Sequence, residues 1–170
     1  MSEPSIQPVF NEETGTLLLR LHTEEVGLGD EAITYQGRRF QPKDEVHITV
    51  IGSTLGEQLL DVLKDDGRRR RLESLVAGTN WDYQLLDRWH YGVRQGETPA
   101  ESIIRMVEAP PLPSFYSALE AITGLSIPAR PAHITLYTRG DDNGIGIATW
   151  GEFEQLVAAD VDPATLGEAT

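Results

Sequence analysis

The sequence contains no cysteine. This absence excludes disulfide bonds, thiolate zinc sites and cysteine nucleophiles. The chain also lacks any run of about 18 consecutive apolar residues, so no segment is expected to cross a membrane as a helix. Its first residues do not combine a basic region with an apolar run, as a secretory signal would. We therefore expect a cytoplasmic protein without a membrane partner.

Positive charge is scarce as well, with 14 Lys and Arg against 27 Asp and Glu and a net charge of −13. Long nucleic acids are bound largely through cationic side chains that neutralise phosphates, so an acidic surface disfavours them. A small phosphate-bearing ligand in a locally favourable cleft is compatible with this charge. We expect a ligand of that kind and a monomeric protein.

The 170 residues, 39% of them hydrophobic, are enough for one domain with a substantial core. Strands are predicted at 16–22, 37–40, 46–52, 81–94, 102–108 and 132–138. Helices are predicted over 54–78 with a break or kink at Gly67, over 114–124 and over 149–157. This mixture indicates an α+β fold in one bilobal domain over 1–160, followed by a flexible tail over 161–170.

Two of the predicted helix starts carry the capping-box pattern, in which a Thr side chain and a Glu three residues later satisfy free backbone amides. The pairs are Thr54 with Glu57 and Thr149 with Glu152. We therefore expect the first and last helices to begin at these threonines.

The tripeptide His-Ile-Thr occurs twice and contains two of the four histidines. Alternate side chains of an extended strand share a face, so His47 and Thr49 point the same way. His133 and Thr135 do the same in the second copy. Each strand is therefore expected to present an imidazole and a hydroxyl about 6–7 Å apart.

Two such strands in one cleft would suit a phosphodiester. One neutral histidine can take a proton from the attacking water, while the other, as imidazolium, protonates the leaving oxygen. The threonine hydroxyls can donate hydrogen bonds to the non-bridging oxygens. This chemistry needs no metal or other cofactor, and we expect none. The alternative is that both histidines are structural.

The segments HITV (47–50) and HITL (133–136) resemble the paired His-x-Thr/Ser-x motifs of the two-histidine (2H) phosphoesterase superfamily. That superfamily includes 2′–5′ RNA ligase-like proteins and cyclic phosphodiesterases. The 86 positions between the two histidines are similar to the spacing in the family. The resemblance implies a two-lobed, pseudo-twofold α+β fold, with antiparallel sheets flanked by helices and both motifs in a central cleft.

The resemblance also implies a metal-independent phosphoesterase that acts on a 2′,3′-cyclic phosphate or a related small nucleotide or RNA-end phosphodiester. His47 and His133 would be the acid and base, in an order that the sequence leaves open, and Thr49 and Thr135 would bind phosphate. Two alternatives stay open. One is a non-catalytic regulatory module that binds a phosphate or nucleotide in the same cleft, and the other is an RNA-end ligase or nuclease.

The residues after the second motif depart from the family. Many members carry an arginine five positions after the second histidine, but here that position is Thr138 and the arginine is Arg139. Strand alternation predicts Tyr137 and Arg139 on the His133 face, about 13 and 20 Å along the strand. Tyr137 is then a candidate to line the substrate or an ordinary strand-edge tyrosine, whereas Arg139 is too distant to share the phosphate.

The remaining polar features are interpreted as structural. The four consecutive arginines at 68–71 spread around a helix and are expected to form a solvated face. His22 and His90 are expected to be packed or surface histidines rather than part of the cleft.

Overall fold

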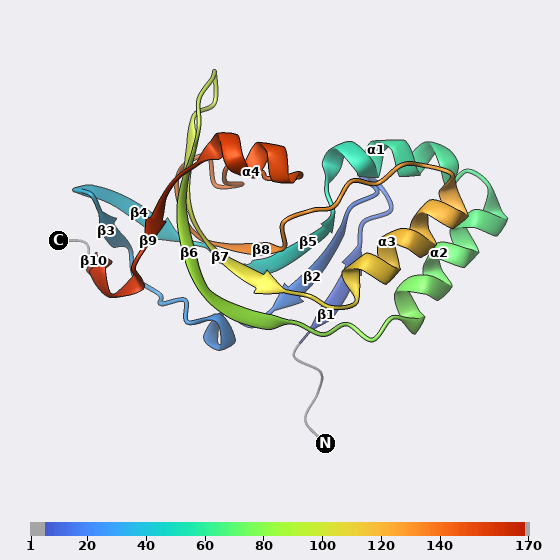
Figure 1. Cartoon of the computed structure of the whole chain (residues 1–170), viewed down its shortest axis with the longest axis horizontal. Helices are drawn as coiled ribbons and strands as arrows, with labels where there is room; N and C mark the ends of the chain where they lie inside the picture. Colours follow the sequence, from blue (N-terminus) through green and yellow to red (C-terminus); the bar gives the residue numbers. More distant parts are fainter. Residues whose placement is uncertain (1–5, 169–170) are drawn as a thin grey trace.

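Antiparallel strands and four α-helices make up residues 6–168, the part of the chain that the computed structural model describes (Figure 1). Every strand pair is antiparallel, and the strands form two separate sheets. The predicted α+β class is therefore confirmed.

The smaller sheet has the strand order β1-β2-β5. Its strands are β1 (Gln7–Phe10), β2 (Leu17–Leu21) and β5 (Val46–Ile51). Alternate residues of β2 and β5 are fully buried, and the residues between them are half-buried or exposed. One face of this sheet therefore covers the core, and the other is left open.

The larger sheet has the order β10-β3-β4-β8-β7-β6-β9. Its strands are β3 (Ile33–Tyr35), β4 (Arg38–Pro42), β6 (Gln84–Arg94), β7 (Ala100–Glu108), β8 (His133–Gly140), β9 (Val157–Val161) and β10 (Gly167–Glu168). The long strands β6 and β7 bend strongly, so that this sheet curls into a half-barrel (Figure 1).

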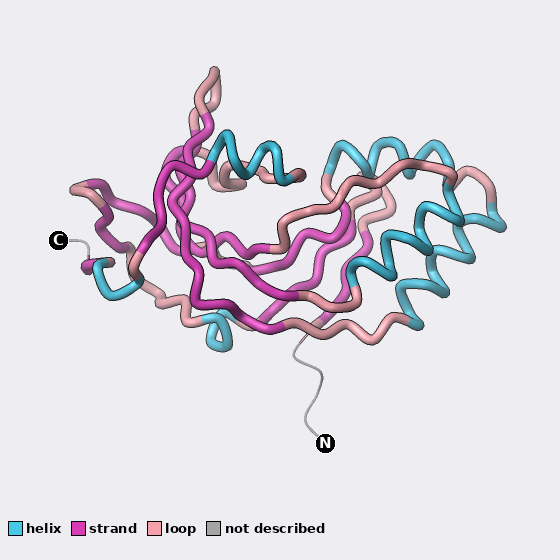
Figure 2. Tube along the Cα trace, in the orientation of Figure 1, coloured by secondary structure: helices cyan, strands magenta, loops and turns pink. Residues whose placement is uncertain are grey.

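The helices are α1 (Ser53–Val62), α2 (Asp66–Gly78), α3 (Leu112–Thr123) and α4 (Trp150–Leu156), with short 3-10 turns at Thr23–Val26 and Pro163–Thr165. Figure 2 shows α1, α2 and α3 together at one end of the molecule and α4 over the curled sheet. The expected helix break is present but falls before Gly67, where the Asp65 side chain accepts a hydrogen bond from the Arg68 amide at 2.9 Å.

Of the two capping boxes, one is confirmed and one is wrong. The Thr149 hydroxyl accepts a hydrogen bond from the Glu152 amide at 3.1 Å, as expected. The first helix instead begins after Gly52, which offers no side-chain cap. Thr54 therefore lies inside the first turn of α1, where it cannot be an N-cap.

Two clusters of buried apolar residues pack against the sheets. The main core lies beneath both sheets and reaches α1, α2 and α3 through residues such as Leu59, Leu72 and Phe115. The smaller core lies on the other face of β7, where Ile145 and Ile147 pack with the residues Ala100, Ile104 and Met106. The segment before α4 is thereby fixed over the inner face of the half-barrel.

The C-terminal segment includes ordered elements in the structure. Val161 is buried, and β10 pairs with β3. Residues 169 and 170 lie outside the described residues, so the flexibility of the segment 161–170 stays a prediction, as does the division into a 1–160 domain. Across residues 6–168, none of the helices has both the length and the apolar character to cross a membrane.

The approach of α1 to the turn before β2 can be tested with two glycine substitutions. A Cβ on Gly56 would lie 2.5 Å from the Thr14 carbonyl oxygen, whereas a Cβ on Gly78 would meet no atom within 4 Å. We expect Gly56→Ala to lower the free energy of unfolding by about 1–3 kcal/mol. The control Gly78→Ala should raise it by up to about 1 kcal/mol, because alanine is the better helix former. Urea unfolding measures both, and an unchanged stability of Gly56→Ala would contradict this close packing.

Candidate active site

The two His-Ile-Thr segments lie on strands that touch without pairing. β5 and β8 are in contact, although they belong to different sheets. The Lys43 amide, directly after β4, donates a hydrogen bond to the Leu136 carbonyl oxygen at 2.9 Å and extends the pairing of β4 with β8, and the chain then enters β5 at Val46. Figure 1 shows β5 and β8 side by side near the middle of the molecule, and each strand carries one of the two motifs.

Both motifs turn the same side chains toward the open side. The apolar residues at the second and fourth motif positions have exposures of 0–1% and belong to the main core: Ile48, Val50, Ile134 and Leu136. His47, Thr49, His133 and Thr135 alternate with them and are half-buried. Because the apolar residues share one core, the four polar residues face the side away from it. This agrees with the strand alternation predicted for the two motifs.

His133 is held in one tautomer by the backbone. Its Nδ1 lies 2.8 Å from the Pro131 carbonyl oxygen, which can only accept, so Nδ1 carries the proton and Nε2 is free as an acceptor. Burial is the largest of the effects that lower the pKa of His133 to about 4. The positive charge of Arg130 and the ring of His47 act in the same direction, and the Pro131 hydrogen bond opposes them. His133 is therefore neutral at pH 7, with its basic nitrogen available.

His47 has a different environment. Its Nδ1 is buried and makes no hydrogen bond within residues 6–168, although it lies 3.9 Å from a carboxylate oxygen of Glu45. Burial lowers the pKa of His47, while Glu45 acts in the opposite direction. The same carboxylate pairs with Arg20 at 3.1 Å. His47 thus has an acidic neighbour that favours its charged form, and His133 has none among its electrostatic partners.

Arg130 is a residue that sequence reasoning missed. It lies three positions before His133 in the loop between α3 and β8, and its charge acts on the pKa of both histidines. Its guanidinium forms no hydrogen bond or ion pair with any of residues 6–168. Arg130 is half-buried, and this burial lowers the pKa of its guanidinium from the ordinary value. Strand alternation carries no information about a loop residue, so no pattern in the sequence indicates its role.

The backbone at Gly52 leaves room for this arginine. A Cβ at that position would lie 2.9 Å from Nη1 of Arg130. The chain therefore has no side chain where β5 ends and the guanidinium approaches. The result is a cation that has no ion-pair partner among residues 6–168 and acts electrostatically on both imidazoles, an arrangement suited to an anionic ligand.

The two threonine hydroxyls are also free. Neither the Thr49 nor the Thr135 side chain forms a hydrogen bond within the described chain. Gly144 packs beside Thr135, since a Cβ on that glycine would lie 3.4 Å from the threonine methyl group. Both hydroxyls can therefore donate to a ligand, with the segment before α4 closing one side of the site.

The predicted placement of Tyr137 is wrong. Thr135 pairs with Ile104 of β7, but Tyr137 pairs with Ile103, so two residues of β8 span a single step of β7. The extra residue, Leu136, forms a β-bulge that reverses the face of everything after it. Tyr137 is consequently buried in the main core, with 6% of its surface exposed, and does not line the cleft.

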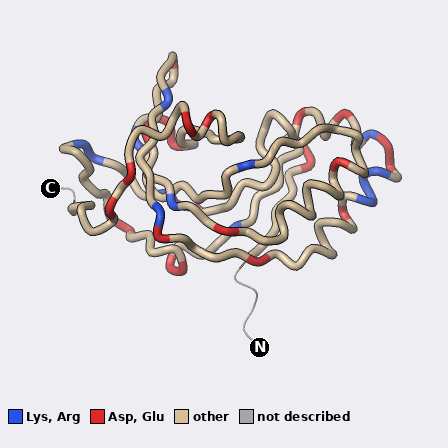
Figure 3. The backbone as a smooth tube through the Cα atoms, viewed as in Figure 1, with Lys and Arg blue, Asp and Glu red and all other residues tan. Residues whose placement is uncertain are grey.

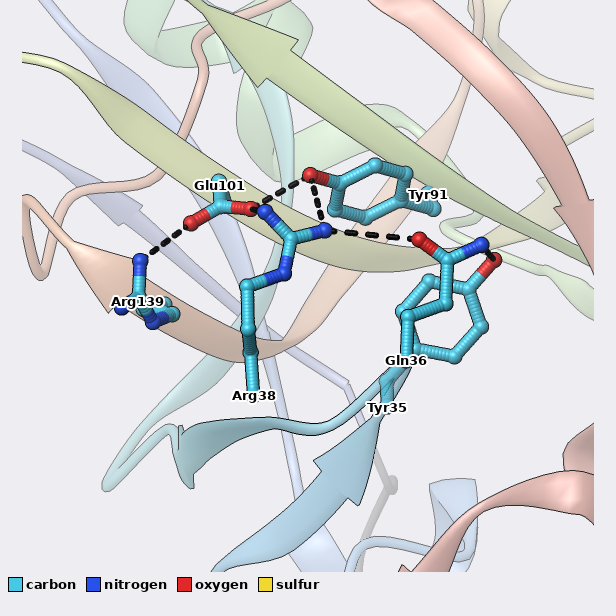
Figure 4. Close-up of polar contacts among 6 residues, drawn as sticks. All are labelled: Tyr35, Gln36, Arg38, Tyr91, Glu101 and Arg139. Atoms are coloured by element: carbon cyan, nitrogen blue, oxygen red, sulfur yellow. Dashed lines mark hydrogen bonds and ion pairs between the residues drawn. The ribbon is translucent and has the colours of Figure 1, made fainter.

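The same bulge changes the face of Arg139. This side chain was predicted on the His133 face, but it lies on the opposite face and bonds to Glu101 at 2.7 Å. Figure 4 shows Glu101 held between Arg139, Arg38 and the Tyr91 hydroxyl. Burial acts to raise the pKa of Glu101, but these partners lower it overall. Arg139 is thus a structural residue, and its predicted absence from the phosphate site is consistent with this pairing.

A cavity of about 450 Å³ is lined by Arg130, the residue whose charge acts on both histidines. Its walls come from the end of β5, the first half of α1, the loop before β8 and the start of α4, and its charged lining residues are Arg94, Arg130 and Glu152. A larger hollow of about 740 Å³ lies elsewhere, beside Ile6 and Trp81, and none of its lining residues belongs to β5 or β8. The smaller cavity is the relevant one because it shares Arg130 with the histidine site.

The other polar features lie apart from this site. His90 bonds through Nδ1 to Asp160 at 2.9 Å and packs edge-on against Phe153, as a structural histidine does. His22 is exposed, and so are the four arginines at 68–71. Figure 3 shows this basic run on α2, at the end of the molecule opposite the half-barrel.

No protein-family model matches the chain, and comparisons with curated proteins and with solved structures gave no match either. Among residues 6–168, His, Asp and Glu side chains do not gather in groups of three or more that could hold a metal ion. The chemical arrangement of the site is therefore the basis for assigning a function.

The low pKa of His133 predicts a pH-dependent stability. The ordinary histidine pKa is 6.5, and that of folded His133 is about 4. Between these values the unfolded chain binds the proton that the folded chain refuses, so the free energy of unfolding should fall as the pH is lowered from about 6.5 to about 4. We expect the decrease in the free energy of unfolding over this pH range to be smaller in His133→Gln than in the wild type, by at most about 3 kcal/mol. Urea unfolding across this range measures it, and identical pH dependence in wild type and variant would contradict the assignment.

Proposed function

We propose that the protein is a metal-independent 2H-type phosphodiesterase that hydrolyses a 2′,3′-cyclic phosphate or a related small nucleotide phosphodiester. The observation that carries the proposal is that three groups, two imidazoles and one guanidinium, interact electrostatically where β5 contacts β8. The imidazoles of His47 and His133 lie on the open side of neighbouring strands, and the unpaired guanidinium of Arg130 acts on both. A base, an acid and an anion-binding cation are what hydrolysis of a phosphodiester requires.

The environments of the two histidines favour different roles. His133 is neutral and directs Nε2 away from the Pro131 carbonyl, so it acts as the base that takes a proton from water. His47 has the Glu45 carboxylate nearby, which favours the imidazolium, so it acts as the acid. The resemblance in sequence leaves these roles interchangeable, and the difference in partners supports the assignment.

The reaction then balances without a further reactant. Water attacks phosphorus and gives a proton to His133, while the bond from phosphorus to one ribose oxygen breaks and that oxygen takes a proton from His47. The products are a phosphomonoester and a free ribose hydroxyl. Arg130 and the hydroxyls of Thr49 and Thr135 stabilise the negative charge on the non-bridging oxygens in the transition state.

The proposal extends to the fold of the 2H superfamily. Each of the two sheets contributes one motif strand, and the strands meet at the centre of the molecule (Figure 1). This supports a two-lobed, pseudo-twofold origin, even though the sheets have three and seven strands. The monomeric state and the cytoplasmic location stay predictions.

Substitution of the histidines tests the chemistry. We expect His47→Ala and His133→Ala each to lower kcat/KM for nucleoside 2′,3′-cyclic phosphates by about 10²–10⁴-fold, because each removes one proton transfer. The measurement is turnover in the presence of a chelator, with the unfolding midpoint of each variant checked. Undiminished activity of both variants would contradict the proposal. Tight binding of the cyclic phosphates by the wild type without any product would favour a non-catalytic binding module instead.

Two arginines provide a matched comparison. Arg130→Gln should lower kcat/KM by about 10–100-fold, the effect of losing one charge-assisted hydrogen bond to the phosphate. Arg139→Gln should leave it nearly unchanged, since Arg139 bonds to Glu101 on the opposite face of β8. Equal losses in the two variants would exclude Arg130 as the phosphate-binding cation.

The role assignment predicts an unusual pH profile. The logarithm of kcat/KM reports the ionisations of the free enzyme. His133 must be neutral, so the acidic limb should lie near its pKa of about 4. His47 must be protonated, and its pKa is below 6.5, so the alkaline limb should lie below that pH. An enzyme that is most active above pH 7 would contradict these roles.

A further inference from the structure

We infer that the cavity beside the histidines is a nucleoside site, which holds the uncharged base and ribose of the substrate while its phosphodiester lies between the imidazoles. This inference rests on the proposed function for the link to the phosphodiester, but the cavity itself can be tested separately. At about 450 Å³ it lies within the range of about 300–1,000 Å³ that is usual for small-molecule sites.

Arg130 links the cavity to the candidate active site. This residue lines the cavity and also acts electrostatically on His47 and His133. Val50 in β5 and Gly52 directly after the strand form part of the cavity wall. A ligand whose phosphate contacts the guanidinium can therefore extend directly into the cavity.

Two residues of opposite charge, Arg130 and Glu152, line the cavity without forming an ion pair. Glu152 nevertheless interacts electrostatically with Arg130. The second arginine of the lining, Arg94, is already satisfied by Asp141 at 3.1 Å and by the Ile145 carbonyl oxygen at 3.3 Å. One carboxylate oxygen of Glu152, Oε2, accepts a hydrogen bond from the Ala148 amide at 3.0 Å. The space between Arg130 and Glu152 thus offers guanidinium donors on one side and the other carboxylate oxygen as an acceptor on the opposite side.

This combination suits a nucleobase better than a second phosphate. The edge of a base presents both hydrogen-bond acceptors and N–H donors, which can bond to a guanidinium and a carboxylate respectively. A second phosphate would be repelled by Glu152. Apolar walls for the faces of the base are provided by Leu55, Ile127 and Pro128.

Nucleosides without a phosphate test the cavity alone. We expect isothermal titration calorimetry to show binding of at least one of adenosine, inosine, cytidine and uridine to the wild-type protein. Ala148→Leu places a larger side chain on the cavity wall and should weaken this binding about tenfold or more. The matched control Ala158→Leu lies exposed on β9 and should bind as the wild type does. Failure of all four nucleosides to bind, or equal binding by Ala148→Leu, would overturn the inference.

The carboxylate can be tested by its effect on base preference. Glu152→Gln keeps the shape of the side chain but replaces the acceptor pair by one acceptor and one amide donor. We expect it to change the order in which the four nucleosides bind, whereas the control Glu154→Gln, exposed on the same helix, should not. An unchanged order in Glu152→Gln would exclude this carboxylate from base recognition and overturn that part of the inference.

Kinetics separate this inference from the proposed function. Wild-type enzyme should favour a nucleoside 2′,3′-cyclic phosphate over glycerol 1,2-cyclic phosphate by about tenfold or more in kcat/KM, and Ala148→Leu should lose most of that preference. Equal turnover of both substrates by the wild type would overturn the nucleoside site and leave the phosphodiesterase standing. Nucleoside binding without hydrolysis of any cyclic phosphate would support the nucleoside site and contradict the phosphodiesterase activity.

Discussion

The contact between β5 and β8 is the constraint on which the candidate site depends. These strands belong to different sheets, so no ladder of hydrogen bonds holds them side by side. They are held together because their apolar residues are buried in the same core. Because Ile48 and Ile134 are fully buried beneath the strands, His47 and His133 must face the other side together.

Environment makes two similar motifs chemically different. The ring of His133 is oriented by a backbone carbonyl and has no acidic neighbour among its electrostatic partners, whereas His47 lies close to Glu45. Burial lowers the pKa of both rings, so the difference comes from the partners rather than from the motif. Arg130 joins the two rings to the neighbouring cavity, and the proposed substrate would extend along the same path.

The features of the fold that depend on strand alternation or helix periodicity could be predicted from the sequence. The alternation of side chains in the two motifs follows from the sequence, and so do the positions of most strands and helices. Prediction from the sequence failed where one residue or a loop decides the geometry. The bulge at Leu136 reversed the faces of Tyr137 and Arg139, and no local pattern indicates a bulge inside an apolar strand. Arg130 lies in a loop, where its approach to the histidines depends on tertiary packing and on the missing side chain at Gly52.

The central claim is that His47 and His133 form one anion-binding site, and imidazole NMR tests it most directly. The chain has four histidines, so His22 and His90 serve as internal controls. A long-range ¹H–¹⁵N spectrum should show His133 with its proton on Nδ1. Addition of a slowly hydrolysed nucleoside 2′,3′-cyclic phosphorothioate should shift the His47 and His133 signals together and leave the other two in place. A shift of only one of the pair, or of neither at saturating ligand, would contradict the account.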